Sequence, residues 1–337
     1  MNMAVRARRA CALLAATLIA LPAIAWAELS EIKVAKQYGI GYLPLMLMED
    51  GKLIEKHAKA VGVDVSVTWA TFAGGNVMND ALLSDSLQFA SGGVGPLLIL
   101  WSRTRGNLDV RAVGSLNSMP LYLVSRNPNV KTIKDLSDKD RIGMPAVKIS
   151  VQALALQMAA EQAFGPGQHN RLDSLTVTMA HPDAMQALLS GQSEINAHFG
   201  SPPFQYQEVA RGGIHVVLNS YDVLGGPATF NVVWTTAKFR SENPKLYDAF
   251  VKALDEAIAE INRDRRAAAE AYLRISKDKD SVENILRMLN DPNIVYTTTP
   301  QNMMKFAEFM QKIGAIKAKP ESWRDLFFPN VQALPGS

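Results

Sequence analysis

A strand–helix–strand pattern occurs twice along the chain, in the same order. The first copy contains Val67–Ala70, Met78 and Ala81–Ser84, and the second contains Val177–Ala180, Met185 and Ala187–Ser190. In each copy the helix ends in Leu-Leu-Ser, and the following strand leads into small residues and proline. Chance similarity between two amphipathic units is one explanation. We favour the other, an internal repeat that folds as two lobes of the same topology.

Short β-branched runs alternate with segments of helical period over most of the chain. Strands are predicted at Ile32–Lys36, Val63–Trp69, Leu87–Ala90, Val110–Val113, Tyr122–Ser125, Arg141–Met144, Leu175–Met179, Ile195–His198, Ile214–Leu218 and Asn231–Thr235. Helices are predicted between them at Pro44–Ala60, Asn76–Leu83, Pro96–Arg103, Ser150–Phe164 and Asp183–Leu189. This alternation predicts an α/β fold of open, mostly parallel sheets flanked by helices. After Asn243 we expect helices only, at Pro244–Arg263, Arg265–Ile275, Ser281–Leu289 and Gln301–Ile313.

Two segments rich in turn-forming residues predict where the chain passes between the lobes. They are Gly114–Pro120 and Asn219–Pro227. We therefore expect residues 28–117 and 221–337 to form lobe I and residues 118–220 to form lobe II. The two crossings predict a hinge, with a ligand cleft between the lobes.

Five glycine-, serine- or proline-containing turns follow predicted strands and point to this cleft. They are Gln37–Pro44, Phe72–Asn76, Ser91–Pro96, Ala146–Ser150 and Phe199–Pro203. Any one of them is ordinary chemistry for starting a helix. Because free backbone amides and the helix dipole attract anions, five such turns at one cleft favour a site for a small anionic or strongly polar molecule.

The N-terminus has the pattern of a secretory signal peptide. Arg6, Arg8 and Arg9 precede an apolar stretch from Ala10 to Ile24, which is followed by Ala25-Trp26-Ala27. A membrane anchor is the alternative, but the stretch is shorter than the roughly 20 residues that span a bilayer. We expect cleavage after Ala27 and a periplasmic protein.

Cleavage would change the charge and the redox chemistry of the chain. Of 35 basic residues 32 would remain, equal to the 32 acidic ones, and the only cysteine, Cys11, would be lost. A neutral chain gives no support for nucleic acid or an anionic membrane as partner. Cysteine catalysis and disulfides are likewise excluded from the mature chain.

No constellation of residues indicates catalysis or a metal. The histidines are scattered at positions 57, 169, 181, 198 and 215, without metal-ligand spacing, and no phosphate loop or nucleophile elbow occurs. His181, before Pro182, is interpreted as a helix-start residue. His198, beside Phe199 at a strand end, is interpreted either as a ligand contact or as a hydrogen-bonded wall residue. We expect no enzyme, no metal and no cofactor.

The export signal, the paired lobes and several turns together resemble a known family. Gln37–Pro44, Phe72–Gly75, Ser91–Pro96, Lys148–Val151 and Val130–Leu136 are similar to segments of the periplasmic substrate-binding proteins of nitrate, sulfonate and taurine ABC importers. The resemblance covers nearly the whole mature chain. It implies a two-lobed type II periplasmic binding protein fold with a helical C-terminal region, and a monomer that delivers a small-molecule ligand to a permease and ATPase complex.

The resemblance also implies which residues contact the ligand. They are Gln37, Tyr38, Tyr42, Gly74, Gly75, Gly92, Gly93, Ile149, Ser150, Phe199 and Ser201, with Phe230 as a further candidate aromatic wall. Sulfonate binders commonly have a Gly-Ser-rich turn where this chain has Val147–Ser150, and this bulk allows a larger or flatter ligand. The ligand class stays open among sulfonates, taurine, nitrate and related solutes. The alternative function is an enzyme on the same two-lobed fold, such as a pyrimidine-precursor protein of the thiamine pathway.

Overall fold

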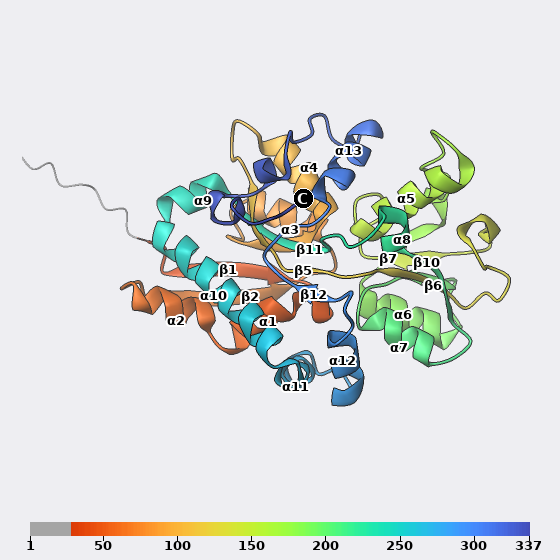
Figure 1. Ribbon diagram of the computed structural model, residues 1–337, viewed down its shortest axis with the longest axis horizontal. Helices are drawn as coiled ribbons and strands as arrows, with labels where there is room; N and C mark the ends of the chain where they lie inside the picture. Colours follow the sequence, from red (N-terminus) through yellow and green to blue (C-terminus); the bar gives the residue numbers. More distant parts are fainter. Residues whose placement is uncertain (1–27) are drawn as a thin grey trace, which may run out of the picture.

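Residues 28–337 are described by the structure, a computed structural model. They form two groups of strands, each covered by helices, which lie side by side in Figure 1. The first sheet has the order β2 (Ser66–Thr71), β1 (Glu31–Lys36), β3 (Ala90–Gly93), β11 (Asn231–Thr235) and β4 (Arg111–Ser115). β3 joins β1 through the parallel bridge between Val34 and Phe89, and β11 runs antiparallel to both β3 and β4.

The second sheet repeats this arrangement. Its order is β8 (Thr176–Thr178), β7 (Ile142–Met144), β9 (Ala197–Phe199), β6 (Tyr122–Ser125) and β10 (His215–Asn219). β8, β7 and β9 are parallel, and β6 is antiparallel to β9 and β10. We call the first sheet with its helices lobe I and the second sheet with its helices lobe II.

The two sheets thus have the same strand order, with one antiparallel strand in fourth place. In each lobe that strand is the one that enters from the other lobe, β11 in lobe I and β6 in lobe II. The remaining strands of each sheet run in one direction, as the alternation of strands and helices predicts. The repeated Leu-Leu-Ser segments end α3 (Gly75–Leu83) and α6 (His181–Ser190), which occupy equivalent places between equivalent strands.

Helices from distant parts of the chain cover the first sheet. α1 (Leu43–Asp50), α2 (Leu53–Ala60) and the long α10 (Pro244–Arg263) pack together on one side, whereas α4 (Val94–Thr104) contacts β3, β4 and β11. Phe250 of α10 stacks on Phe89, with ring centroids 3.8 Å apart. α10 is strongly amphipathic, so its apolar stripe reaches the core while its charged face meets water.

α5 (Val151–Phe164) belongs to lobe II but is enclosed on all sides over its first ten residues. It contacts α4 of lobe I, α8 (Ser220–Leu224) and α13 (Met303–Lys312). A helix that is apolar all round is stable only when surrounded. The sequence of α5 therefore requires the lobes to lie against each other at this point.

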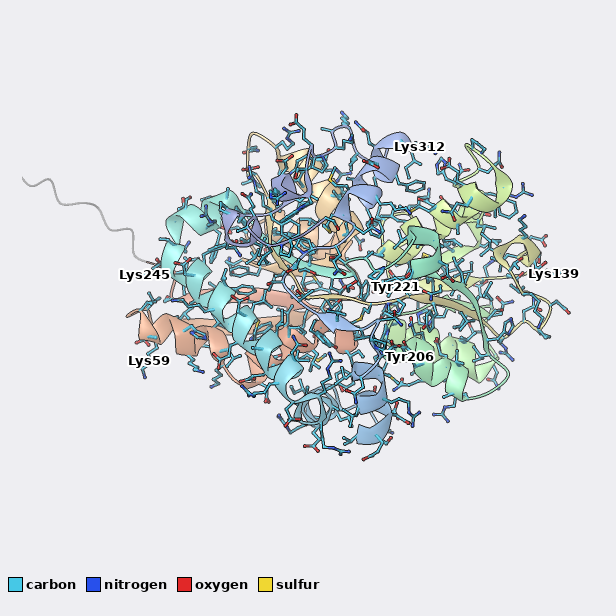
Figure 2. All side chains as sticks on the ribbon, viewed as in Figure 1. Lys59, Lys139, Tyr206, Tyr221, Lys245 and Lys312 are labelled. Carbon is cyan, nitrogen blue, oxygen red and sulfur yellow. The ribbon has the colours of Figure 1, made fainter. Side chains whose placement is uncertain are left out.

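The chain crosses between the lobes at β5 (Asn117–Ser118) and again near α8. β12 (Val295–Tyr296) pairs with β5 at the first crossing. The hydroxyl groups of Ser118 and Tyr221 lie 2.9 Å apart, and Ser118 also donates to the carbonyl of Ala228 at 2.7 Å. Tyr221 lies centrally in Figure 2, between Lys59 and Lys139 at opposite ends of the molecule. The two crossing segments are thus tied directly to each other.

The C-terminal region touches both lobes. α12 (Val282–Leu289) packs on α11 (Arg265–Ser276), and Asp291 just beyond it accepts a 3.1 Å hydrogen bond from Tyr206 of α7 (Phe204–Ala210) in lobe II. On the other side Lys312 of α13 pairs with Glu161 of α5 at 2.5 Å. α9 (Ala237–Glu242) and the short 3₁₀ turns at Ile40–Tyr42, Ile133–Asp135, Asp173–Leu175, Trp323–Leu326 and Pro329–Val331 complete the fold.

Several predicted elements differ from the observed ones. The helix expected at Pro44–Ala60 is two helices, because the chain turns at Gly51 and at Lys52, which has φ 48°. The strand expected at Leu87–Ala90 lies later in the chain, because β3 begins at Ala90 and ends at Gly93. The sequence patterns did not predict α7, α8, α9, β5 or β12, which are short and held by tertiary contacts rather than by periodicity.

Candidate functional site

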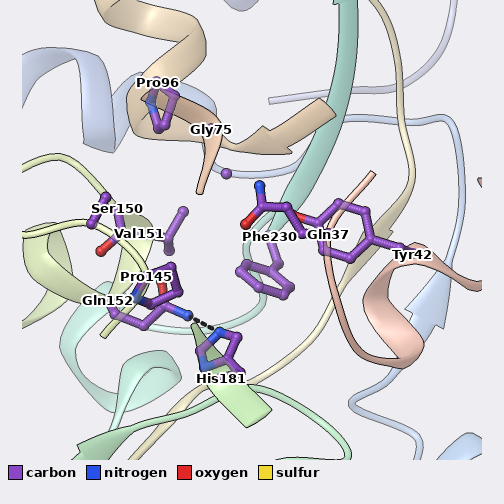
Figure 3. A pocket seen from close by; sticks show the side chains of 12 residues that line it. Gln37, Tyr42, Gly75, Pro96, Pro145, Ser150, Val151, Gln152, His181 and Phe230 are labelled. Carbon is purple, nitrogen blue, oxygen red and sulfur yellow. Dashed lines mark hydrogen bonds between the residues drawn. The ribbon is translucent and has the colours of Figure 1, made fainter. Parts of the chain in front are cut away.

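A small cavity lies between the lobes (Figure 3). Its volume is about 20 Å³, room for about one water molecule. It is lined by Gln37, Tyr42, Gly75, Gly93, Pro96, Pro145, Ala146, Ser150, Val151, Gln152, His181 and Phe230. Gln37 follows β1, Gly93 ends β3, Pro145 follows β7, and His181 comes shortly after β8. The cavity thus lies at the carboxyl ends of strands from both sheets, where open α/β folds bind ligands.

Four helices begin at this cavity. The first residue of α3 is Gly75, the N-cap of α4 is Gly93, the N-cap of α5 is Ser150, and the first residue of α6 is His181. Each helix start carries unpaired backbone amides and the positive end of a helix dipole. Among residues 28–337, no Lys, Arg, Asp or Glu lines the cavity. Backbone dipoles and neutral side chains therefore face the cavity, and helix starts of this kind suit an anionic group.

Ser150 caps α5 as its position before an apolar run predicts. Its hydroxyl oxygen accepts a 3.1 Å hydrogen bond from the backbone N–H of Ala153. The neighbouring Lys148 is exposed with φ 67°, so its charge faces solvent rather than the cavity. Ser150 is nevertheless part of the cavity wall and keeps unused hydrogen-bonding capacity there.

Gln37 supplies a buried amide on the lobe I side of the cavity. It is 7% exposed, and its amide nitrogen donates to the carbonyl oxygen of Ser91 at 3.3 Å. Its carbonyl oxygen has no hydrogen bond to the described part of the chain. Tyr42 and Phe230 form the aromatic wall beside it (Figure 3). Burial raises the pKa of Tyr42 far above its usual value, so its hydroxyl stays neutral.

Glycines of lobe I let the backbone of lobe II approach closely. A Cβ atom added to Gly74 would lie 2.9 Å from the carbonyl oxygen of Pro145, and one added to Gly93 would lie 2.7 Å from a methyl group of Val151. One added to Gly95 would collide with the carbonyl oxygen of Ile149. On the other side of the cleft, the N–H of Ile40 donates to the carbonyl of Pro202 at 3.2 Å. The lobes are therefore closed on each other.

His181 begins a row of buried polar side chains. Its Nε2 atom lies 3.2 Å from the amide nitrogen of Gln152, and its Nδ1 atom lies 2.8 Å from Nε2 of His198. Nδ1 of His198 in turn lies 2.6 Å from a carboxylate oxygen of Glu208. Burial, and then the neighbouring His198, hold the pKa of His181 well below its usual value. His181 is therefore neutral at physiological pH.

Half of the residues proposed as ligand contacts line the cavity, and half do not. Those that line it are Gln37, Tyr42, Gly75, Gly93, Ser150 and Phe230. Of the others, Tyr38 is 39% exposed, and Phe199 points into the core with 0% exposure. Gly74 and Ile149 lie in the contact between the lobes, and Gly92 packs on Gln37 and Trp234. Ser201 is buried beside the cis Pro202–Pro203 segment and is absent from the cavity wall.

The sequence patterns missed several cavity residues, notably Gln152 and His181. His181 does begin a helix, as expected, but its burial and its bond to His198 appear only when β8 and β9 are placed in one sheet. His198 is 0% exposed and is a hydrogen-bonded residue behind the cavity wall. The signal available for Gln152 is its position two residues after Ser150, at a helix start predicted to face the cleft.

Within residues 28–337 no cluster of three or more His, Cys, Asp or Glu side chains has the arrangement of a metal site. The same residues contain no helix that is both long and apolar enough to cross a membrane. The expected signal peptide, residues 1–27, lies outside the described part of the chain.

Two lobes of identical strand order, with the cavity between them, define the class of the protein as a periplasmic binding protein fold. The family model of the NMT1-like family matches residues 27–276, and the chain belongs to this family. No curated protein matches the chain.

Solved structures agree on the fold at low sequence identity. The alkanesulfonate-binding protein SsuA from Xanthomonas axonopodis pv. citri, bound to MOPS, has a TM-score of 0.65 and 18% identity, over 86% of this chain and 92% of its own. The ligand-binding component of an ABC-type import system from Staphylococcus aureus has a TM-score of 0.67 and 15% identity, over 90% and 98%. The periplasmic nitrate-binding protein NrtA from Synechocystis PCC 6803 has a TM-score of 0.65 and 15% identity, over 88% and 84%.

Proposed function

We propose that this protein is the extracytoplasmic solute-binding component of an ABC importer and that it captures a small anionic or polar organic solute between its lobes. The observation that carries the proposal is the convergence of four helix starts on one cavity, which no charged side chain of the described residues lines. Backbone amides and neutral donors can hold a sulfonate, nitrate or similar anion without a salt bridge.

The tightness of the cavity supports a cycle of opening and closing. An organic anion is far larger than the single water that about 20 Å³ accommodates. The solute would therefore enter an opened cleft, with residues 28–117 and 221–337 moving relative to residues 118–220. The segments around Ser118 and Tyr221, which cross between the lobes, are the proposed hinge.

Similar structures support a solute in this chemical range. The Xanthomonas protein is an alkanesulfonate-binding protein with MOPS bound, and the Synechocystis protein is a nitrate-binding protein. By analogy, the protein would act in the periplasm as a monomer after removal of residues 1–27. Its partners would be a membrane permease and the associated ATPase. Val147 and Ile149 do not line the cavity, so their bulk sets no preference between small and larger sulfonates.

A thermal-shift screen tests the proposal directly. The purified protein is heated with nitrate, taurine, methanesulfonate, longer alkanesulfonates, MOPS, aromatic acids and pyrimidines. A solute at 100 times its dissociation constant should stabilise the fold by about 2.7 kcal/mol. Small-angle scattering of the same samples should then detect lobe movement. Stabilisation by no anion of the panel would contradict the proposal, and turnover of a bound compound would favour an enzyme on this fold.

A further inference from the structure

A continuous row of four side chains leads from the cavity into the interior of lobe II. Gln152 and His181 lie in the cavity wall, His198 lies on β9 behind them, and Glu208 lies on α7 (Figure 3 shows the first two). The successive distances are 3.2, 2.8 and 2.6 Å. The ring of His181 also stacks on Phe204, with centroids 5.6 Å apart, which fixes its orientation.

This row is shielded from solvent and from other charges. The exposed fractions are 2% for Gln152, 6% for His181 and 0% for both His198 and Glu208. Within residues 28–337 no Lys, Arg or Asp forms an ion pair or hydrogen bond with any of the four. Tyr42 across the cavity stays neutral, and Asp183 on α6 is exposed. The second oxygen of Glu208 is buried without a partner.

Each of the three close contacts needs one hydrogen atom between its two polar atoms. This requirement determines which nitrogen atom of each histidine carries a hydrogen. With Glu208 ionised and both histidines neutral, His198 donates from Nδ1 to Glu208, and His181 donates from Nδ1 to His198. Nε2 of His181 is then an acceptor, and the Gln152 amide N–H can donate to it, as the observed orientation of Gln152 allows. In this state the row carries one negative charge.

One additional proton reverses the donor and acceptor roles between His198 and His181. If the proton enters from solvent and is shared by His198 and Glu208, Nε2 of His198 becomes a donor to Nδ1 of His181. His181 remains neutral but now carries its hydrogen on Nε2, at the cavity. The row is then neutral overall and presents a donor where it previously presented an acceptor.

We propose that the cleft binds an anionic solute together with one proton, which is stored between His198 and Glu208. This inference rests on the proposed function and names His181 and Gln152 as residues that contact the anion. An anion would be repelled by the negatively charged row, in which Nε2 of His181 offers no hydrogen and holds the Gln152 N–H. The protonated row removes the charge and offers an N–H group, and the Gln152 amide can also turn its N–H toward the anion.

A catalytic triad requires a nucleophile that is hydrogen-bonded to its histidine, and residues 28–337 place none beside His181. Within residues 28–337 no Ser, Thr or Tyr hydroxyl hydrogen-bonds to His181, and the Ser150 hydroxyl accepts from the backbone of Ala153. We assign the row to binding because its first two members, Gln152 and His181, form part of the cavity wall.

The test measures anion affinity as a function of pH. Methanesulfonate and nitrate are the probes, because neither changes its charge between about pH 5.5 and 8.5, so any pH dependence belongs to the protein. Calorimetry should show a Kd that rises by up to about tenfold per pH unit at the alkaline end, as one proton per anion requires. The same titration at alkaline pH is then repeated in two cationic buffers that differ in ionisation enthalpy. The difference between the two binding enthalpies gives the number of protons taken up, which should be close to one for the unmodified protein.

Two variants separate this row from histidine–carboxylate pairs in general. Glu208→Gln is uncharged and its amide can donate to His198, so it should bind the probes with a Kd that no longer depends on pH. The control is Glu256→Gln, which removes the partly exposed partner of His57, also 2.6 Å away. The control should keep the pH dependence of the unmodified protein.

The outcomes distinguish this inference from the proposed function. Anion binding without proton uptake, or an unchanged pH dependence in Glu208→Gln, would overturn proton coupling and leave the solute-binding role intact. Failure of every anion in the screen to bind at any pH would overturn both. Proton uptake near one that disappears in Glu208→Gln would establish the coupling.

Discussion

A side-chain carbon on Gly95 would collide with the carbonyl oxygen of Ile149, so the first turn of α4 in lobe I lies directly against the segment that precedes α5 in lobe II. The contact consists of backbone on backbone and leaves no room for any residue but glycine. It couples the position of α5, whose start lines the cavity, to the closure of the lobes.

Gly95→Ala should therefore prevent full closure. The lobes would stay apart by the width of a methyl group, and the four helix starts would no longer converge on one anion. We expect a larger radius of gyration in the presence of methanesulfonate and at least tenfold weaker binding. Arg103→Ala, an exposed change on the same helix, serves as control and should alter neither quantity. Unchanged affinity in Gly95→Ala would mean that this contact is not needed for binding.

Ser150→Ala should lower both stability and affinity. Loss of the cap to Ala153 should cost about 1 kcal/mol in the free energy of unfolding. If Ser150 also contacts the anion, affinity should fall by roughly 0.5 to 3 kcal/mol. Ser281→Ala removes an equivalent cap at 3.2 Å on α12, far from the cavity, and should lower stability alone. Denaturant titration and calorimetry separate the two effects, and equal affinities in both variants would restrict Ser150 to capping.

Gln37→Met should weaken anion binding while leaving the fold nearly as stable. Methionine has a similar shape but offers neither the donor to Ser91 nor polar atoms to the cavity. A lost neutral hydrogen bond corresponds to about 0.5–1.5 kcal/mol, a factor of roughly two to thirteen in Kd. Gln88→Met, which removes a half-buried amide that accepts from the backbone of Lys33 and does not line the cavity, should leave Kd unchanged. Equal affinities for the two variants would remove Gln37 from the site.

His181 should make the fold sensitive to acid. Its pKa is lowered in the folded state, first by burial, so below about pH 6.5 the unfolded chain binds a proton that the folded chain does not. Stability should thus be fully present above that pH and fall by up to about 1.4 kcal/mol per pH unit below it. In His181→Gln the free energy of unfolding should depend less steeply on pH, even if its absolute value also changes. Denaturant unfolding at several pH values checks the slope, and the same slope in both proteins would contradict the assignment.

Much of the fold was predictable because the determining signals are local. α10 spans Pro244–Arg263 as its amphipathic period and Pro at the first turn indicate, and Ser150 caps α5 because a hydroxyl precedes an apolar run. The repeat around Ala81 and Ala187 correctly predicted matching lobes with α3 and α6 in equivalent places.

The candidate site was less predictable because it depends on how the lobes meet. A glycine that admits a ligand and a glycine that admits another backbone look the same in sequence, and Gly74 and Gly95 contact lobe II. Phe199 and His198 are neighbours on β9, so strand alternation sends their side chains to opposite faces. The row from Gln152 to Glu208 joins four separate elements, and no spacing in the chain encodes it.

The antiparallel fourth strand has a consequence for the order of events during synthesis. β11 separates β3 from β4, so β4 has no neighbour in its sheet until residues 231–235 have left the ribosome. Lobe II lies between these segments in the chain and contains all five of its own strands before β11 is made. Lobe II can therefore complete its sheet first, although it comes second in the sequence. Until β11 is made, the sheet of lobe I remains incomplete. We expect pulse-labelled hydrogen exchange to protect β7 and β9 before β4, and a chaperone that binds nascent chains to hold the first lobe longest.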